Sequence, residues 1–280
     1  MKRVYLDHNA TMPLRAEARE AMLGAMDVVG NPSSVHAEGR AAKTLLEKAR
    51  SQLAEAIGAQ AADIVFVSGS TEAAALAMAG RGLACSAIEH DAVRAWGADT
   101  LPCDVNGLVE IADPATSALQ FANSETGVIQ TLPDGLAVSD WTQGFGKLPL
   151  AFDWSGVEMA FVSAHKIGGP KGIGALILKR GLDLAAQIRG GGQEMGRRSG
   201  TENLIGIAGF GGAAAAVTQD IEIGLWSRVE KLRNILEKAL EPRANKTIFV
   251  GKEVSRLPNT SLMVTPGWKG ETQVMQMDLA

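Results

Sequence analysis

Cysteine is scarce in this sequence: Cys85 and Cys103 are the two among 280 residues. Two cysteines cannot build the disulfide framework that is typical of small secreted proteins. The four histidines stand at no close metal-binding spacing from either cysteine. We therefore expect a protein of the reducing cytoplasm with no bound metal, and two thiols that are structural or inert.

An excess of charge of one sign is also missing. Charged residues make up 21% of the chain, and the formal net charge is −4. This near balance argues against a protein that binds nucleic acid or a membrane surface, because both need a concentrated basic patch. No apolar run has the length of a signal peptide or of a membrane span, so we expect a soluble protein.

Aromatic residues are few as well, at 5%, whereas glycine is frequent, with 32 residues. The 46% of hydrophobic residues suffices for a substantial core. The length fits one large domain, or one large and one small domain. Alanine-rich helices and glycine-rich turns together indicate an α/β enzyme rather than a binding module.

Hydrophobic periodicity predicts strands and helices that alternate along most of the chain. The expected helices are 16–26, 35–57, 73–79, 203–218, 221–240 and one that begins near 273. The expected strands are 4–6, 63–67, 84–88, 118–122, 136–139, 157–161, 174–178, 247–250 and 260–264. Ser33 or Ser34 should cap helix 35–57, and the glycine- and arginine-rich segment 188–201 should form a functional loop.

Polar side chains follow one predicted strand after another. The clusters are Ser70 and Thr71; His90; Asn123 and Ser124; Asp140 and Gln143; and Ser163, His165 and Lys166. Any one cluster has an ordinary structural explanation, such as a helix cap or a surface turn. In open α/β sheets, however, ligands bind beyond the carboxyl ends of the strands. Five clusters in series therefore indicate a ligand site.

The segment 162–172 carries the most reactive group of this series. It is a glycine-rich turn between two apolar strands, and it contains Lys166 and Lys171. A lysine held at the rim of a buried sheet loses part of its solvation, which favours the neutral amine and Schiff-base formation. Lys166, directly after His165, is the candidate for this chemistry, and Lys171 is expected to be a structural or interface residue.

Pyridoxal 5′-phosphate is a cofactor that needs such an amine. It also needs a cradle for its phosphate and a carboxylate beside its pyridine nitrogen. Asp140 can supply the carboxylate, Gln143 can bind the phenolic oxygen, and His90 can lie on the ring. The candidates for the phosphate cradle are Ser70, Thr71, Ser163 and His165.

Eight motifs run through the chain in a fixed order. They are 5–11 (YLDHNAT), 30–36 (GNPSSVH), 68–72 (SGSTE), 88–90 (IEH), 123–127 (NSETG), 140–147 (DWTQGFGK), 163–172 (SAHKIGGPKG) and 197–201 (RRSGT). In order and residue types the chain resembles cysteine desulfurases of the NifS/IscS type. These belong to the class-V aminotransferase group of fold-type-I pyridoxal-phosphate enzymes. The Ser-x-His-Lys and Arg-Ser-Gly-Thr elements are the most specific parts of the resemblance.

The resemblance implies a fold-type-I α/β architecture. A mostly parallel sheet of the seven-stranded type would be flanked by helices, with a smaller, incomplete α+β domain at the C-terminus. The implied division is an N-terminal segment 1–15 that belongs with the small domain, a large cofactor-binding domain 16–220 and a partial small domain 221–280. The resemblance further implies a homodimer in which two subunits build each site.

The resemblance also implies roles for individual residues. Lys166 would bind the cofactor covalently, and His90 would stack on the ring as an acid–base group. Asp140 would pair with the pyridine nitrogen, and Gln143 would bind the phenolic oxygen. The phosphate ligands would be Ser70, Thr71, Ser163, His165 and, across the subunit interface, Thr201. The implied reaction converts L-cysteine to L-alanine and passes sulfur, as an enzyme persulfide, to a sulfur-acceptor or iron–sulfur scaffold protein.

Three features depart from the family pattern. Ser124 stands where the second position of its motif is commonly Asn, so the cofactor contact falls to Asn123 or to Ser124. Stretches near 80–87, 97–118 and 130–139 are shorter than usual, which indicates a compact variant. In the family, the nucleophilic cysteine and the substrate-carboxylate arginine follow the helix that begins near 273, and these 280 residues end before both positions. We therefore expect a C-terminally truncated member that binds the cofactor but turns over cysteine poorly or not at all.

Two alternatives stay open on the sequence alone. The first is another class-V enzyme, such as a selenocysteine lyase or an aminotransferase. The second is a non-catalytic dimerising scaffold for sulfur-carrier proteins. The presence of Lys166, Asp140 and His90 argues against the scaffold, which has no need of them.

Overall fold

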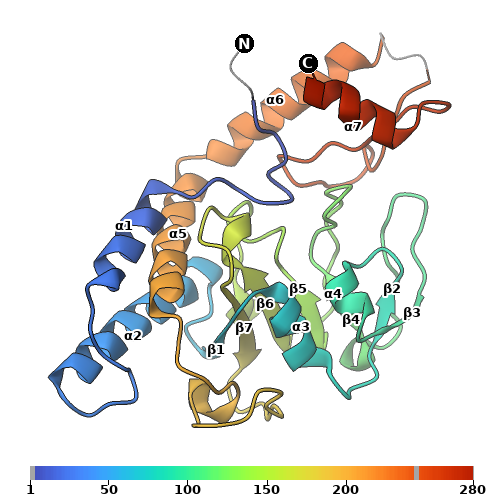
Figure 1. Ribbon diagram of the computed structural model, residues 1–280. Helices are drawn as coiled ribbons and strands as arrows, with labels where there is room; N and C mark the ends of the chain where they lie inside the picture. The colour runs from blue at the N-terminus through green and yellow to red at the C-terminus, as the bar shows by residue number, and fades with distance from the viewer. Residues whose placement is uncertain (1–3, 243–245, 280) are drawn as a thin grey trace.

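The computed structural model describes residues 4–242 and 246–279, with a sheet at its centre (Figure 1). Five strands are hydrogen-bonded in the order β1-β7-β6-β5-β4. These strands are β1 (Ala62–Val67), β4 (Ala118–Gln120), β5 (Val138–Asp140), β6 (Met159–Ser163) and β7 (Gly174–Lys179). β4, β5 and β6 are parallel, whereas β7 is antiparallel to both neighbours. β7 is inverted because a short turn joins it to β6, and a short connection can only reverse the chain.

Two further strands extend the sheet beyond β4. β2 (Ala84–Ser86) and β3 (Ala98–Leu101) form a parallel pair, and a parallel bridge between Ala84 and Ser117 joins this pair to the end of β4. Most of the strand pairs are thus parallel. The predicted mostly parallel sheet of the seven-stranded type is confirmed.

Helices cover both faces of the sheet, because successive side chains of a strand point to opposite sides. Ile64 and Phe66 of β1 pack into one hydrophobic cluster, and Val65 and Val67 pack into the other. The first cluster is covered by α1 (Ala16–Met26), α2 (Ala37–Ile57) and α5 (Leu204–Glu222); the second is covered by α3 (Ser70–Met78) and α4 (Asp91–Arg94). The result is a three-layer α/β/α arrangement.

Helix α5 is the core helix of the first layer. The expectation that no apolar run reaches the length of a membrane span is wrong for this helix, which is long and apolar enough by length and composition alone; much of its apolar stretch is buried inside the protein. Glycines allow its close approach to the two neighbouring helices. A Cβ on Gly211 would lie 2.8 Å from the Ala49 Cα of α2, and a Cβ on Gly212 would lie 2.8 Å from the Glu17 carbonyl oxygen of α1.

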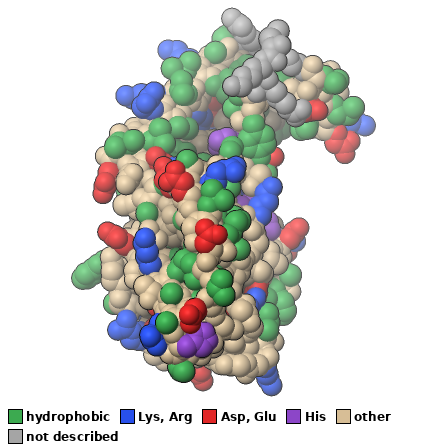
Figure 2. Space-filling model, turned by 60° about the vertical axis from the view of Figure 1, so that its left-hand side comes forward, with side chains coloured by type: hydrophobic (Ala, Val, Ile, Leu, Met, Phe, Trp, Pro, Cys, Tyr) green, Lys and Arg blue, Asp and Glu red, His purple; other side chains and the backbone are tan. Residues whose placement is uncertain are grey.

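Charged side chains of both signs are interspersed on the side of the molecule that α1 and α2 form (Figure 2). Several of them join elements that are distant in sequence. Arg15, just before α1, pairs with Asp220 of α5 at 2.5 Å. Arg50 of α2 pairs at 2.9 Å with Glu194, which belongs to the glycine-rich loop before α5. These ion pairs hold the outer helices and the loop against the sheet.

The C-terminal part of the chain lies beside the N-terminal segment, at the top of Figure 1. Its elements are α6 (Leu225–Leu240), β8 (Ile248–Phe249), β9 (Met263–Val264) and α7 (Gly270–Leu279). Trp226 of α6 donates its indole N–H to the Gly146 carbonyl at 2.6 Å. The division into 1–15, 16–220 and 221–280 stays a prediction, and its residues 1–3, 243–245 and 280 lie outside the described part.

The structure corrects several predicted elements. Residues 4–6 form no strand, because the chain turns at once and the Tyr5 hydroxyl donates to the carbonyls of Asp7 and Thr11. His36, rather than Ser33 or Ser34, caps α2, and its Nδ1 accepts from the Gly39 amide. The helix predicted over 221–240 begins only at Leu225, after Gly224 at φ +70°.

The packing of α5 predicts opposite effects for two glycine-to-alanine substitutions. Gly211→Ala should lower the free energy of unfolding by about 1 to 3 kcal/mol, because its Cβ would meet the backbone of α2. Gly24→Ala in α1 is the matched control, because a Cβ there meets nothing within 4 Å. It should raise the free energy of unfolding by up to about 1 kcal/mol through helix propensity. Equal effects of both variants in urea unfolding would contradict the packing argument.

Candidate active site

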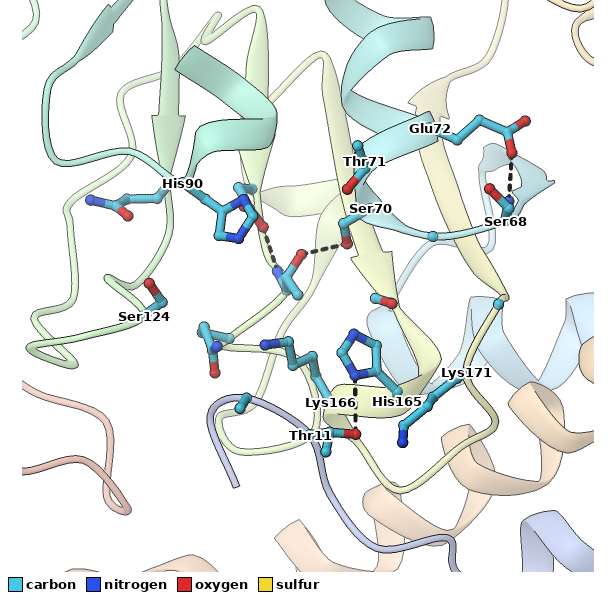
Figure 3. A pocket seen from close by; sticks show the side chains of 18 of the residues that line it. Thr11, Ser68, Ser70, Thr71, Glu72, His90, Ser124, His165, Lys166 and Lys171 are labelled. Atoms are coloured by element: carbon cyan, nitrogen blue, oxygen red, sulfur yellow. Dashed lines mark hydrogen bonds between the residues drawn. The ribbon is translucent and has the colours of Figure 1, made fainter. Parts of the chain in front are cut away.

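The carboxyl ends of the parallel strands open into a cavity of about 650 Å³. β1 runs parallel to β6, since both are antiparallel to β7, so its carboxyl end reaches the same edge. Nine of the eleven predicted site residues line this cavity: Ser70, Thr71, His90, Ser124, Asp140, Gln143, Ser163, His165 and Lys166. In Figure 3, Ser70, Thr71 and His165 lie on one side, and the Lys166 amine is directed toward His90 and Ser124.

One wall of the cavity is suited to an anion. Ser70 and Thr71 form the first turn of α3, where backbone N–H groups are free and the helix dipole is positive. Gly69 precedes them, and a Cβ there would meet only the Ser163 hydroxyl, at 4.0 Å. The bare backbone at Gly69 therefore leaves room for a group such as a phosphate between α3 and the end of β6.

Glu72, a carboxylate beside this wall, has its negative charge balanced by hydrogen bonds and an ion pair. Glu72 accepts from the Ser68 amide at 2.8 Å and from the Arg198 guanidinium at 2.9 Å. Burial raises the pKa of Glu72, but these hydrogen bonds outweigh it and leave the pKa below its usual value. Glu72 thus binds the arginine-rich loop and adds little repulsion toward an anion at α3.

Lys166 and Gln143 direct their donors at one oxygen. The Lys166 amine donates to the carbonyl oxygen of Asn9, and Gln143 Nε2 donates to the same oxygen at 2.9 Å. Burial lowers the pKa of the half-buried Lys166 amine, and the Asp140 carboxylate opposes this shift only in part. A larger fraction of this amine is therefore neutral and nucleophilic near neutral pH than of an ordinary lysine.

Asp140 ends β5 and faces the cavity from the floor. Its Oδ1 accepts from the Thr142 amide at 2.8 Å, and the Thr142 hydroxyl bonds the Ser70 hydroxyl at 2.7 Å. Burial raises the pKa of Asp140, while Thr142, His90 and Lys166 pull it back. A positively charged ring nitrogen placed here would stabilise the carboxylate further.

Two histidines lie on different walls of the cavity. His90 caps α4, and its Nδ1 accepts from the Ala92 amide at 3.1 Å, which leaves Nε2 to carry the ring proton. His165 Nδ1 bonds the Thr11 hydroxyl at 3.2 Å. Burial and the neighbouring Lys166 and Lys171 lower the pKa of His165, so this ring is neutral at pH 7.

The arrangement matches a known family over almost all of the chain. Residues 4–97 and 105–274 match the family described as aminotransferase class-V. The chain belongs to the class-V aminotransferases. Solved structures of NifS-like proteins have a similar fold.

Three similar proteins illustrate the family relationship. A cysteine desulfurase of Cereibacter sphaeroides is 37% identical over 318 residues, which covers 100% of this chain and 81% of the relative. The cysteine desulfurase IscS of Dictyoglomus turgidum is 35% identical in an alignment that covers 100% of this chain and 80% of the relative. The crystal structure of a NifS-like protein from Rickettsia africae ESF-5 matches with a TM-score of 0.90 at 34% identity, over 99% of this chain and 85% of that one. The two sequence alignments, each over 318 residues, are longer than the 280 residues of this chain, so these two relatives have residues at positions where this class-V chain has none.

Two predicted residues of this class-V chain lie outside the cavity. The Asn123 side chain is buried and occupied: its amide donates to the Ile88 carbonyl at 2.9 Å, and its oxygen accepts from the Thr126 amide at 2.9 Å. Asn123 therefore shapes the loop, while Ser124 lines the cavity. Thr201 is exposed and borders a separate hollow beside Arg198. Lys171, expected to be a structural or interface residue, lines the cavity itself.

Several contributors were missed at the level of sequence. Thr142 stands between two predicted site residues, so the strand-end pattern could have included it. Asn9 and Thr11 belong to the N-terminal segment, and they meet Lys166 and His165 only in three dimensions. Their positions in the YLDHNAT motif were the one available signal.

The lowered pKa of Lys166 predicts how it reacts with a small aldehyde and a mild borohydride. In cofactor-free protein, modification of Lys166 should begin at a lower pH than modification of the exposed lysines. The reason is that an amine with a lowered pKa becomes neutral at a lower pH. Peptide mass spectrometry from about pH 6 to about pH 10 measures this order. Lys166→Arg removes the modified peptide and checks its assignment. Modification of Lys166 only at the pH of exposed lysines would refute the argument.

Proposed function

We propose that this chain is a pyridoxal-phosphate-dependent cysteine desulfurase that takes L-cysteine to L-alanine. The observation that carries the proposal is the meeting, in one cavity, of a nucleophilic amine, a buried carboxylate and the anion-binding end of a helix (Lys166, Asp140 and α3). Relatives named cysteine desulfurases, at 33% and 37% identity over the whole of this chain, support this choice of substrate.

The residues present fit the cofactor. Lys166 and Gln143 both donate to the Asn9 carbonyl oxygen, so the donors that a ring oxygen of the cofactor needs already converge at this side of the cavity. Lys166 would bind the aldehyde, Asp140 the pyridine nitrogen and Gln143 the phenolic oxygen. The phosphate would be held by Ser70, Thr71, Ser163 and His165. When bound, the cofactor supplies an electron sink for charge that develops on the substrate.

Proton transfer to and from the substrate would then depend on side chains of the protein. Burial lowers the pKa of Lys166, so its amine releases a proton more readily than that of an ordinary lysine. His90 presents Nε2 to the cavity, because its other nitrogen accepts from the backbone of α4. The Asp140 carboxylate would stabilise positive charge on the ring nitrogen of a bound cofactor. These three groups divide the work of binding, electron withdrawal and proton transfer.

The sulfur acceptor in this proposal is a thiol other than Cys85 and Cys103. Cys85 is buried in β2, and burial together with the hydrogen bond to Asp99 raises its pKa to about 12, so it is protonated at neutral pH. Cys103 is exposed but does not line the cavity. Neither thiol can therefore receive sulfur at Lys166.

The proposal extends to the assembly and its partners. It includes a cytoplasmic homodimer in which Thr201 of each subunit reaches the partner's cavity, and a sulfur-acceptor or iron–sulfur scaffold protein as recipient. The exposure of Thr201 in a loop that Glu72 and Arg198 anchor supports the dimer. The name IscS of one relative supports the assignment to sulfur delivery.

Cofactor binding can be tested by absorption. Protein mixed with pyridoxal 5′-phosphate should show a new near-visible band that survives gel filtration. Lys166→Ala should abolish the covalent band, and borohydride should then trap no cofactor on the protein. With an added dithiol as sulfur acceptor, Asp140→Asn should still bind the cofactor but form alanine from L-cysteine about 100-fold or more slowly than the wild type, because the ring nitrogen loses its charged partner. A wild-type protein without the band would refute the proposed function.

The two cysteines give a second test. Alanine formation from L-cysteine in the presence of an added dithiol should be unchanged in Cys85→Ala/Cys103→Ser, since neither thiol reaches the cavity. Amino-acid analysis of the product measures this. Loss of alanine formation in a variant whose far-ultraviolet circular dichroism and cofactor band are intact would show that one of these thiols takes part.

A further inference from the structure

Lys147 is a buried lysine that the proposed chemistry does not use. It is 2% exposed and lies in the turn that follows β5. Within the described residues its amine forms no ion pair, and both of its hydrogen bonds go to Gln143. Burial lowers the pKa of this amine to about 7, so folding must overcome the desolvation of the group. Because the burial of this amine is unfavourable, we expect Lys147 to have a function that an apolar side chain could not perform.

One of the two hydrogen bonds of Lys147 determines the orientation of the Gln143 carboxamide, and the other holds the lysine amine in place. The Lys147 amine donates to Gln143 Oε1 at 2.8 Å and to the Gln143 main-chain carbonyl at 2.9 Å. A glutamine amide can be turned by 180° with little change in shape, so only its partners distinguish its oxygen from its nitrogen. With Oε1 held by Lys147, Nε2 is the end that donates at the cavity, to the Asn9 carbonyl at 2.9 Å.

We propose that Lys147 is a positioning residue that holds the Gln143 carboxamide with its N–H₂ group toward the cavity. The cavity then presents a hydrogen-bond donor at this point, and it selects a ligand with an acceptor oxygen there. For the proposed cofactor that oxygen is the phenolic one, so this part of the inference rests on the proposed function. The orientation of the amide itself does not.

Among the residues around Lys147, Gln143 is the one that its amine hydrogen-bonds. On the cavity side, the charged group that acts on it is Lys166, which disfavours a second positive charge nearby. On the other side, the turn borders a hollow of about 270 Å³ that Glu230 and Arg256 also line. Packing alone would be satisfied by methionine, which has a similar length and no donor.

The spectrum of the cofactor-bound protein tests the proposal. A donor to the phenolic oxygen favours its ionised form, so Lys147→Met should raise the pKa of the bound chromophore by about half to one pH unit. Gln143→Leu should cause a similar rise, and Lys147→Met should add nothing in that background. An unshifted pKa in a folded Lys147→Met protein, or a further shift in the double variant, would overturn the proposal.

Trp226→Phe is the matched control for damage to the turn. It removes the hydrogen bond to the Gly146 carbonyl, next to Lys147, without touching the Gln143 carboxamide. It should lower the melting temperature and leave the pKa of the chromophore unchanged. An equal shift in Trp226→Phe would show that any loosening of the turn moves the pKa, and that Lys147 has no specific role.

A measurement without cofactor separates this proposal from the proposed function. The ¹⁵N signal of the Gln143 side-chain amide, identified by its loss in Gln143→Leu, reports exchange of its protons with water. Lys147→Met should speed this exchange about tenfold, because the amide is no longer held against Asn9. Unchanged exchange would overturn the positioning role even if the cofactor binds. Failure of the wild type to bind cofactor would refute the proposed function alone.

Discussion

Partial burial of opposite charges at one edge of the sheet is the constraint on which the cavity depends. Burial pushes Lys166 toward its neutral amine and Asp140 toward its neutral acid, and each group partly restores the charge of the other. The parallel pairing of β5 and β6 places Asp140 opposite Phe161, two residues before the β6 carboxyl end. The backbone therefore holds nucleophile and carboxylate near each other before any ligand arrives, and no reorganisation is needed to bring them together.

The N-terminal segment completes this edge through Asn9. Its side-chain amide donates to the Ser124 carbonyl at 3.0 Å and to the Thr260 hydroxyl at 2.9 Å, while its side-chain oxygen accepts from Asn259 at 2.8 Å. Its main-chain oxygen receives the donors of Lys166 and Gln143. One asparagine thus connects the cavity, the loop after β4 and the C-terminal part of the chain. Through Asn9, Lys166 is linked by hydrogen bonds to segments that lie 115 and 251 residues from Asn9 in the sequence.

Strand positions along the chain and the polar residues at strand ends were predictable because they rest on local patterns. Apolar runs identified β1, β6 and β7 within one or two residues, and the polar residue after each strand identified the wall of the cavity. Residues 4–6 look like a strand by the same criterion, but they have no partner in the sheet and turn instead. The sequence could not decide whether Asn123 or Ser124 faces the cavity, because it does not show that the Asn123 amide is hydrogen-bonded within its own loop.

The residue types and their order alone determined the α/β class, the candidate lysine and carboxylate, and the resemblance to a family. Periodicity and strand-end polarity are properties of short segments, so they can be recognised without knowledge of the rest of the chain. Tertiary structure decided which distant groups meet: Asn9 at Lys166, Thr142 at Ser70 and Lys147 behind Gln143. The pKa shifts belong to the same class, because desolvation depends on what packs around a side chain rather than on its neighbours in sequence.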